Sequence, residues 1–175
     1  ADGRTKNAFK ALLQAGSQRQ RPKGKQKMNY SIRKILPSDK DEFIKMSREF
    51  YSSDAVLYNI DDSFHFSTFE ELMRSDVYLE CYIFETDKDE IAGYALLDKM
   101  FSHEVGGMLV WVEELYVREA FQNNGIGSAF FAFLEKNIPA ARYRLETEPE
   151  NEGARALYKR KGFKNLEYLQ MVKNV

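Results

Sequence analysis

Hydrophobic and polar residues alternate in several short stretches of the chain, a pattern typical of β-strands. The first stretch covers residues 29–36, NYSIRKIL. Leu79–Glu85 and Ile91–Leu97 flank the polar turn Thr86–Asp89, so they predict an antiparallel hairpin. Further strands are predicted at Met108–Val117, Arg142–Thr147 and Leu166–Val172.

Helices are predicted where apolar residues recur every three or four positions. In Lys40–Tyr51, the side chains of Phe43, Met46 and Phe50 line one face, and Pro37-Ser38-Asp39 precedes it with capping residues. Three more helices are predicted: a short one at Phe69–Arg74 after Ser67-Thr68, one at about Ile126–Asn137, and one at Glu152–Lys161 that Gly162 ends. The mixed order of strands and helices, without an internal repeat, predicts an α/β (α+β) fold.

The composition is that of one compact domain, since 175 residues that are 43% hydrophobic can bury one good core. Charge is distributed unevenly along the chain. Residues 1–27 hold eight basic residues and one acidic residue, a net charge of +7, whereas residues 28–175 hold 18 basic and 26 acidic residues, a net charge of -8. We therefore separate a basic N-terminal extension, 1–27, from a domain at 28–175. The acidic domain is expected to attract cations and not nucleic acid.

Within the extension, residues 5–15 have the spacing of a short amphipathic helix. The extension lacks the pattern of a secretory signal, and the only cysteine is Cys81, so no disulfide within the chain is expected. The apolar run Ala129–Leu134 is too short to span a bilayer, and no membrane association is expected. We expect a reducing, cytoplasmic location.

The turn Gln122–Ser128, QNNGIGS, lies where a predicted strand gives way to a predicted helix. Gly125 and Gly127 permit close approach of the backbone, and the helix N-terminus adds positive potential, so the turn is a candidate anion site. No Lys-Ser/Thr pair follows, which excludes a Walker A loop, and Phe130 breaks the dinucleotide pattern. A plain turn with glycine caps remains the alternative.

Glu113 and Glu114 stand in VWVEELYV, a stretch otherwise suited to burial. Strict alternation places Glu113 on the same face as Trp111, Leu115 and Val117. A carboxylate held among apolar side chains has a raised pKa, which suits a general base. The alternative for either residue is a solubilising charge on an edge strand.

The stretch Asn151–Phe163, NEGARALYKRKGF, contains a tyrosine that could donate a proton and several cations that could bind phosphate. Tyr158 could equally be a core aromatic, and the cations a solvated helix face. His65 and His103 lack the spacing of metal ligands, so no metal is expected and both are predicted to be loop residues.

The two stretches Gln122–Ser128 and Asn151–Phe163, at this spacing and after these strands, resemble the GNAT family of N-acetyltransferases over residues 28–175. The resemblance implies a mixed, mostly antiparallel sheet that splays between its fourth and fifth strands, is flanked by helices and binds acetyl-CoA in the gap. It implies these cofactor-binding residues: Leu115, Tyr116, Val117, Gln122, Asn123, Asn124, Gly125, Ile126, Gly127, Ser128, Asn151, Arg155 and Tyr158.

Within the family, VEELYV looks most like the spermidine/spermine and thialysine acetyltransferases, which also have adjacent acids in this strand. The implied activity is direct transfer of an acetyl group to a primary amine, a small cationic one, by a homodimer. Glu113 would be the base and Tyr158 the acid, while Tyr51, Asp54, Glu113 and Glu114 would bind the amine. The alternative function is a non-catalytic acyl-CoA sensor or interaction module.

Overall fold

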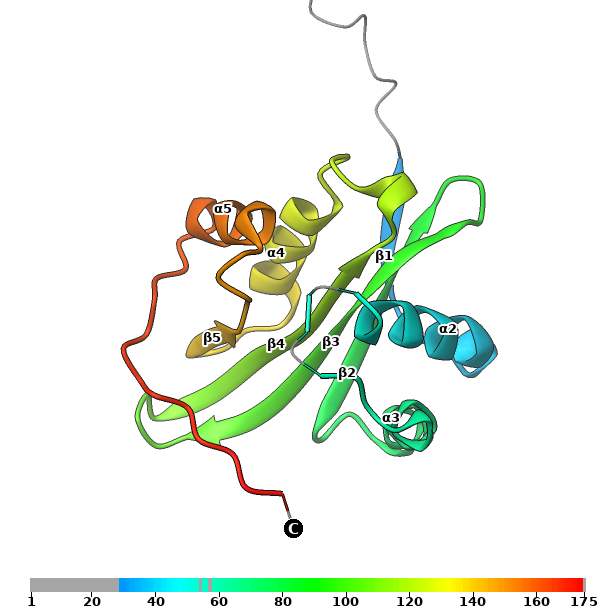
Figure 1. Ribbon diagram of the computed structural model, residues 1–175. Coiled ribbons are helices and arrows are strands. Elements are labelled where there is room, and N and C mark those ends of the chain that lie inside the picture. The colour runs from blue at the N-terminus through cyan, green and yellow to red at the C-terminus, as the bar shows by residue number, and fades with distance from the viewer. Residues whose placement is uncertain (1–28, 54, 57, 175) are drawn as a thin grey trace, which may run out of the picture.

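The computed structural model describes residues 29–53, 55–56 and 58–174. A single five-stranded sheet crosses the molecule in the order β1-β2-β3-β4-β5 (Figure 1). Its strands are β1 (Tyr30–Lys34), β2 (Leu79–Thr86), β3 (Ile91–Ser102), β4 (Gly107–Val117) and β5 (Arg142–Leu145). The first four are antiparallel neighbours, and β5 lies parallel to β4. The mixed sheet confirms the predicted fold class.

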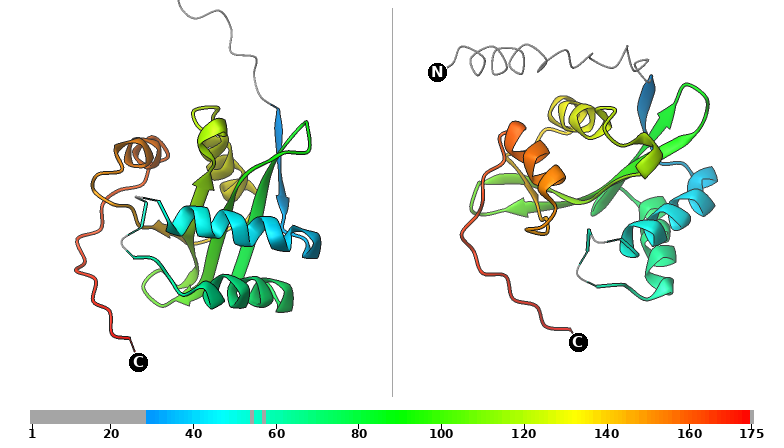
Figure 2. Two further views of the ribbon diagram at one scale, coloured as in Figure 1. Left: turned by 45° about the vertical axis from the view of Figure 1, so that its right-hand side comes forward. Right: turned by 45° about the horizontal axis from the view of Figure 1, so that its top comes forward.

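Helices cover both faces of the sheet (Figure 2). Helices α2 (Lys40–Tyr51) and α3 (Asp62–Arg74) pack on one face, while α4 (Ile126–Asn137) and α5 (Glu152–Arg160) pack on the other. A short 3-10 turn, η1 (Pro37–Asp39), precedes α2, and a second one, η2 (Glu119–Phe121), follows β4. None of the helices within these described residues is both long and apolar enough to span a membrane.

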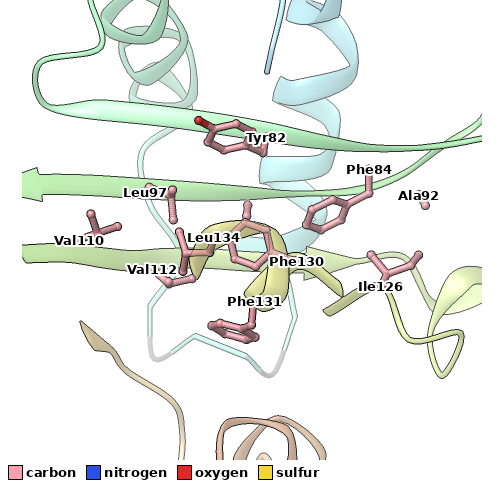
Figure 3. Close-up of a cluster of buried hydrophobic side chains, with 11 residues drawn as sticks. Tyr82, Phe84, Ala92, Leu97, Val110, Val112, Ile126, Phe130, Phe131 and Leu134 are labelled. Carbon is pink, nitrogen blue, oxygen red and sulfur yellow. The ribbon is translucent and has the colours of Figure 1, made fainter. Parts of the chain in front are cut away.

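Two hydrophobic clusters, one on each face, follow from the alternation of side chains along the strands. Beneath α4, Phe130, Phe131 and Leu134 pack on strand residues such as Phe84 and Val110 (Figure 3). Beneath α2 and α3, the cluster comprises Ile35, Phe43, Ile44, Met46, Phe69, Leu72, Cys81, Ile83, Tyr94 and Leu96. The buried Cys81 thiol has a raised pKa because of desolvation, which suits a core residue.

Helix α3 begins earlier than the sequence pattern predicts. The predicted start at Phe69 is wrong, because the Asp61 carboxylate caps the helix by accepting a hydrogen bond of 2.9 Å from the Ser63 backbone N–H. His65 consequently lies within α3, only 3% exposed, and its assignment to a loop is wrong. His103 does lie in the turn between β3 and β4.

The strand predicted at Leu166–Val172 is also wrong. This segment forms no β-ladder and runs away from β5 (Figure 1). Its apolar side chains are largely exposed, with Leu169 and Met171 at 89% and 90%. Its alternating pattern suits a strand, but a strand also needs a partner edge for its backbone groups. Within the described residues this segment has no backbone hydrogen bond to β5, and the Gln170 amide donates to the Glu146 side chain. The predicted helix at 5–15 and Asp54 lie outside the described residues.

Candidate active site

The sheet opens between β4 and β5. The two strands pair only from Leu109 with Arg142 to Val112 with Leu145. Strand β4 continues to Val117, so its last five residues present a backbone edge without a β5 partner. Exposed strand edges bind extended groups through their N–H and C=O groups, which is the geometry expected for the amide-containing arm of coenzyme A.

A β-bulge lies at the point where the sheet opens. Leu96 pairs with Glu114 and Leu97 pairs with Val112, so Glu113 is an extra residue between two matched pairs. The prediction that Trp111, Glu113, Leu115 and Val117 all share one face is wrong for this reason. Leu115 and Val117 instead pack with Val112 in the cluster under α4.

A cleft of about 1010 Å³ surrounds this opening, a volume that suits a large ligand. Its walls come from the end of α2 and the following loop, β4, β5, α5 and the C-terminal segment. It brings together several predicted site residues: Tyr51, Glu113, Leu115, Asn151, Arg155 and Tyr158. Residues distant in sequence thus form one site.

Glu113 has the electrostatic properties of a base that works near neutrality. Its side chain is exposed in the cleft. Desolvation by the surrounding walls, followed by the negative charges of Asp98, Glu114 and Glu146, raises its pKa to about 7. Both the ionised and the protonated form are therefore populated at neutral pH.

Glu114 occupies a different environment and is only 5% exposed. Its carboxylate accepts a hydrogen bond from the hydroxyl group of Tyr94, and the nearby Tyr51 hydroxyl also favours the ionised form. Desolvation raises its pKa to about 7, although these two donors oppose the shift. Tyr51 lines the cleft, whereas Glu114 lies behind the cleft wall.

A polar chain continues inward from Glu114. Tyr94 is in hydrogen-bonding contact with Ser47, whose hydroxyl lies 2.8 Å from Nδ1 of His65. Ser47 and His65 are both buried, and burial lowers the pKa of His65. Because each buried polar group has a partner, the chain holds Glu114 in one position.

The turn before α4 has the conformation of an anion cradle. Asn123 and Gly125 have positive φ values of 62° and 85°, and no side chain caps the helix at Gly125. The first N–H groups of a helix lack partners within the helix, so those of α4 are suited to a phosphate. The side chains of Gln122 and Asn124 do not project toward a ligand but donate to Val117, Phe121 and Gln122 carbonyl oxygens within the loop. The turn therefore offers its backbone N–H groups, and not these two side chains, to a ligand.

Packing accounts for two other residues of the turn. A Cβ on Gly127 would lie 2.9 Å from a Leu157 methyl carbon, so glycine lets α5 approach α4. Ile126 is 2% exposed in the core, and only its backbone is available to a ligand. Ser128 is exposed on the first turn of α4.

Tyr158 and Asn151 face the cleft from α5 and its start. The Tyr158 ring packs edge-on against Phe131 and Phe163, with centroids 5.7 Å and 6.1 Å away. Desolvation raises the pKa of its hydroxyl, which therefore stays protonated at neutral pH. Asn151 caps α5 by accepting from the Ala154 N–H, and Arg155 donates to the Pro149 carbonyl at 2.7 Å.

A comparison with protein families matches residues 41–163 to the acetyltransferase (GNAT) family. The chain belongs to the GNAT family. It is therefore an acetyl-CoA-dependent N-acetyltransferase, and the open β4 edge and the uncapped α4 turn fit acetyl-CoA as the acetyl donor.

Solved structures show the same fold at low sequence identity. A possible acetyltransferase from Clostridium difficile 630 has a TM-score of 0.69 and 18% identity, covering 84% of this chain and 98% of the other. The aminoglycoside N-acetyltransferase AAC(6')-Iy in complex with CoA has a TM-score of 0.68 and 19% identity, covering 88% and 98%. Glucosamine-6-phosphate N-acetyltransferase from Arabidopsis thaliana has a TM-score of 0.61 and 22% identity, covering 83% and 98%. A comparison with curated proteins finds no significant match.

The cleft also contains residues that the sequence did not identify as site residues. Trp111 and Arg144 line it, with the guanidinium carbon 4.5 Å from the Trp111 ring centroid. Asp98, opposite Trp111 on β3, contributes negative charge near Glu113. Asp98, Trp111 and Arg144 are neighbours because of the register in which β4 pairs with β3 and β5. No local sequence pattern predicts that register.

Proposed function

We propose that the enzyme transfers the acetyl group directly from acetyl-CoA to a primary amine that enters as a cation. The observation that carries the proposal is Glu113, an extra residue in β4 whose carboxylate is in the cleft where the sheet opens. Its pKa of about 7 suits proton transfer near neutral pH.

Glu113 is the proposed general base. An alkylamine has a pKa of about 10.4 and arrives protonated, so a proton must leave before the nitrogen lone pair can attack the thioester carbonyl carbon. Glu113, directly or through a water molecule, takes this proton. The nearby negative charges of Asp98 and Glu146 attract the ammonium group to the same place.

Tyr158 is the proposed general acid. As the new C–N bond forms and the C–S bond breaks, the coenzyme A thiolate leaves; a comparable thiol has a pKa of about 8.5. The protonated Tyr158 hydroxyl donates to this sulfur. The nitrogen loses its second proton to solvent as the amide forms. Solvent returns a proton to Tyr158 and takes the proton from Glu113, so one proton is released for each acetyl group transferred. The N–H groups of the open β4 edge are suited to stabilise the oxyanion.

The proposed acceptor is a small cationic amine. Support comes from Tyr51 and Glu113 in the cleft wall and from Glu114 behind Tyr51. The resemblance of VEELYV to the spermidine/spermine and thialysine acetyltransferases points in the same direction. Asp54 remains a proposed acceptor contact from sequence alone.

The test is the pH dependence of thiol release from acetyl-CoA with a panel of polyamines, amino acids, aminoglycosides and lysine peptides. We expect turnover of the wild type to rise with pH and to level off above about 7. Glu113→Gln should lower turnover by about 100-fold below pH 7, and the deficit should shrink at higher pH as free amine accumulates. Tyr158→Phe should lower turnover while the Kd for acetyl-CoA stays largely unchanged.

Wild-type turnover by both variants at every pH would refute the roles assigned to Glu113 and Tyr158. Binding of acetyl-CoA without transfer to any acceptor in the panel would favour the sensor function instead. Isothermal titration with CoA separates a loss of binding from a loss of chemistry.

We also propose a homodimer in a reducing, cytoplasmic compartment. The family resemblance and an exposed apolar patch support the dimer; the patch comprises Val77, Tyr78, Met100, Phe101 and Met108. A single, buried cysteine supports the reducing compartment. Light scattering on the purified protein measures the oligomeric state, and a monomer at micromolar concentration would contradict the dimer.

A further inference from the structure

Arg144 and Trp111 form a stacked pair on the floor of the cleft. The two residues are direct neighbours in the parallel ladder between β4 and β5. The Arg144 guanidinium carbon lies 4.5 Å from the Trp111 ring centroid, and both side chains line the cleft. At this distance a guanidinium packs against the aromatic ring, and none of the hydrogen bonds within the described residues uses the N–H donors of Arg144.

Arg144 differs from most arginines in the described part of the chain. Five others, Arg33, Arg48, Arg74, Arg118 and Arg142, each form an ion pair with a carboxylate. Among residues 29–53, 55–56 and 58–174, no carboxylate lies within 4.0 Å of the Arg144 guanidinium. Glu146, two residues farther along, is instead engaged by the amide of Gln170.

Arg155, Lys159 and Lys164 line the cleft from α5 and the segment after it, whereas the part of the cleft that the sheet forms has two ends of opposite charge. The anionic end is Glu113, with Asp98, Glu114 and Glu146 close enough to raise its pKa. The cationic end is Arg144. Glu113 lies two residues along β4 from Trp111, and Arg144 lies one strand over, so strand geometry separates their α-carbons by about 8 Å.

We propose that Arg144, stacked on Trp111, binds an anionic oxygen group that belongs to the acceptor. The acceptor then presents its ammonium group to Glu113 and a carboxylate or a phosphate to Arg144. This inference rests on the proposed acetyl transfer and narrows its substrate class. Planar guanidinium groups bind these anions bidentately, and a stacked guanidinium is already oriented for binding.

The spacing between the two ends favours acceptors whose amine and anion are separated by several bonds. A basic amino acid acetylated on its side-chain amine satisfies both ends at once. A polyamine supplies the cation but places a second positive charge beside Arg144. The arrangement thus selects an amino acid or an aminosugar phosphate over a simple polyamine.

The test compares matched acceptors that differ only in the anionic group: lysine with cadaverine, ornithine with putrescine, and glucosamine 6-phosphate with glucosamine. We expect kcat/KM of the wild type to be about 10-fold to 100-fold higher for the anionic member of at least one pair, as a charge-assisted hydrogen bond contributes in a desolvated site. The amino acid pairs report on carboxylate binding and the sugar pair reports on phosphate binding.

Arg144→Met should bring this ratio close to one by raising KM for the anionic acceptor. Arg142→Met is the matched control, because Arg142 lies on the same strand and face, pairs with Glu104 and does not line the cleft. It should keep the wild-type ratio. Arg144→Lys should retain part of the ratio, since it keeps the charge but loses the planar fork.

Equal kcat/KM within all three pairs would overturn the proposal, and so would an unchanged ratio in a folded Arg144→Met protein. Circular dichroism and Tm verify that each variant is folded. Failure of the broader proposed function gives a different result, because no amine, including cadaverine and putrescine, would then be acetylated.

Discussion

The bulge at Glu113 gives the two adjacent carboxylates of β4 different exposures to solvent. Glu113 is the extra residue of a bulge and is exposed in the cleft, whereas Glu114 is paired in the ladder and buried. Both pKa values lie at about 7, mainly through desolvation. Both titrations are coupled to folding, because both pKa values are raised, but only the Glu113 carboxylate is exposed to a ligand in the cleft.

Glu114 should make the protein less stable as pH rises. Its folded pKa of about 7 lies above the unfolded value of 4.5, so the folded state binds the proton more tightly. The stabilisation is complete below about pH 4.5 and is lost as pH rises to about 7. Glu114→Gln, which cannot ionise, should gain stability relative to the wild type between pH 5 and pH 8, by at most about 3 kcal/mol. Urea denaturation at the two pH values measures this.

The pH trend distinguishes this effect from a simple packing defect. A packing defect would shift the free energy of unfolding equally at pH 5 and pH 8. Glu85→Gln serves as the control, because Glu85 lies in β2, away from the sheet opening, and forms a partly buried ion pair with Arg33. The prediction would be contradicted if the stability of Glu114→Gln, relative to the wild type, fell between pH 5 and pH 8.

At the scale of elements, the turn before α4 depends on a backbone conformation that favours glycine. Gly125 has φ of 85°, where a Cβ costs about 1 kcal/mol, although the nearest atom to that Cβ would be 3.9 Å away. Gly125→Ala should therefore lower stability by about 1 kcal/mol and raise KM for acetyl-CoA, with a smaller effect on KM for the acceptor. Steady-state kinetics and urea denaturation measure the two effects.

Gly153→Ala is the matched control for that substitution. Gly153 lies in α5, its φ is not positive, and nothing lies within 4 Å of a Cβ built on it. Alanine should therefore stabilise this helix by up to about 1 kcal/mol. If Gly125→Ala changes the free energy of unfolding in the same direction as Gly153→Ala, the turn does not require a glycine with positive φ at position 125.

Local pattern predicted most of the elements. Helix α2 has its predicted bounds, and the β2–β3 hairpin forms as the flanking alternation and polar turn indicate. The hydrophobic pattern gave wrong predictions where the local structure depends on residues that are distant in sequence. VEELYV contains no sign of the bulge, and the segment after Lys164 has a strand-like sequence but no partner edge. The motifs identified the GNAT family, while the contact between Trp111 and Arg144 depends on the strand register.

At the scale of the whole molecule, the C-terminal segment, residues 164–174, forms one wall of the cleft but contributes no side chain to the buried core. Residues 164–174 are exposed and form no ladder, yet Leu166, Tyr168 and Gln170 line the cleft. A chain ending at Lys164 should keep the free energy of unfolding within about 0.5 kcal/mol, because little area or backbone hydrogen bonding is lost. Its KM for the acceptor should rise several-fold.

Thermal unfolding and acceptor kinetics on the shortened chain check both statements. Leu169→Ser is a milder control, because Leu169 belongs to the same segment but does not line the cleft. A large loss of Tm in the shortened chain would mean that the segment supports the fold, and an unchanged acceptor KM would mean that it does not form the cleft wall.

The bulge in β4 has a consequence for how this site could be gained or lost. Without Glu113, Val112 and Glu114 would be consecutive residues of β4. They could keep their present partners on β3, Leu97 and Leu96, in a regular ladder. The faces of Leu115 and Val117 would stay the same, because the rest of the strand alternates as though Glu113 were absent. The carboxylate assigned as the base is thus the one position of this strand that the sheet can do without. A single-codon deletion would remove the chemistry while sparing the architecture, and a single-codon insertion into a regular strand could create it.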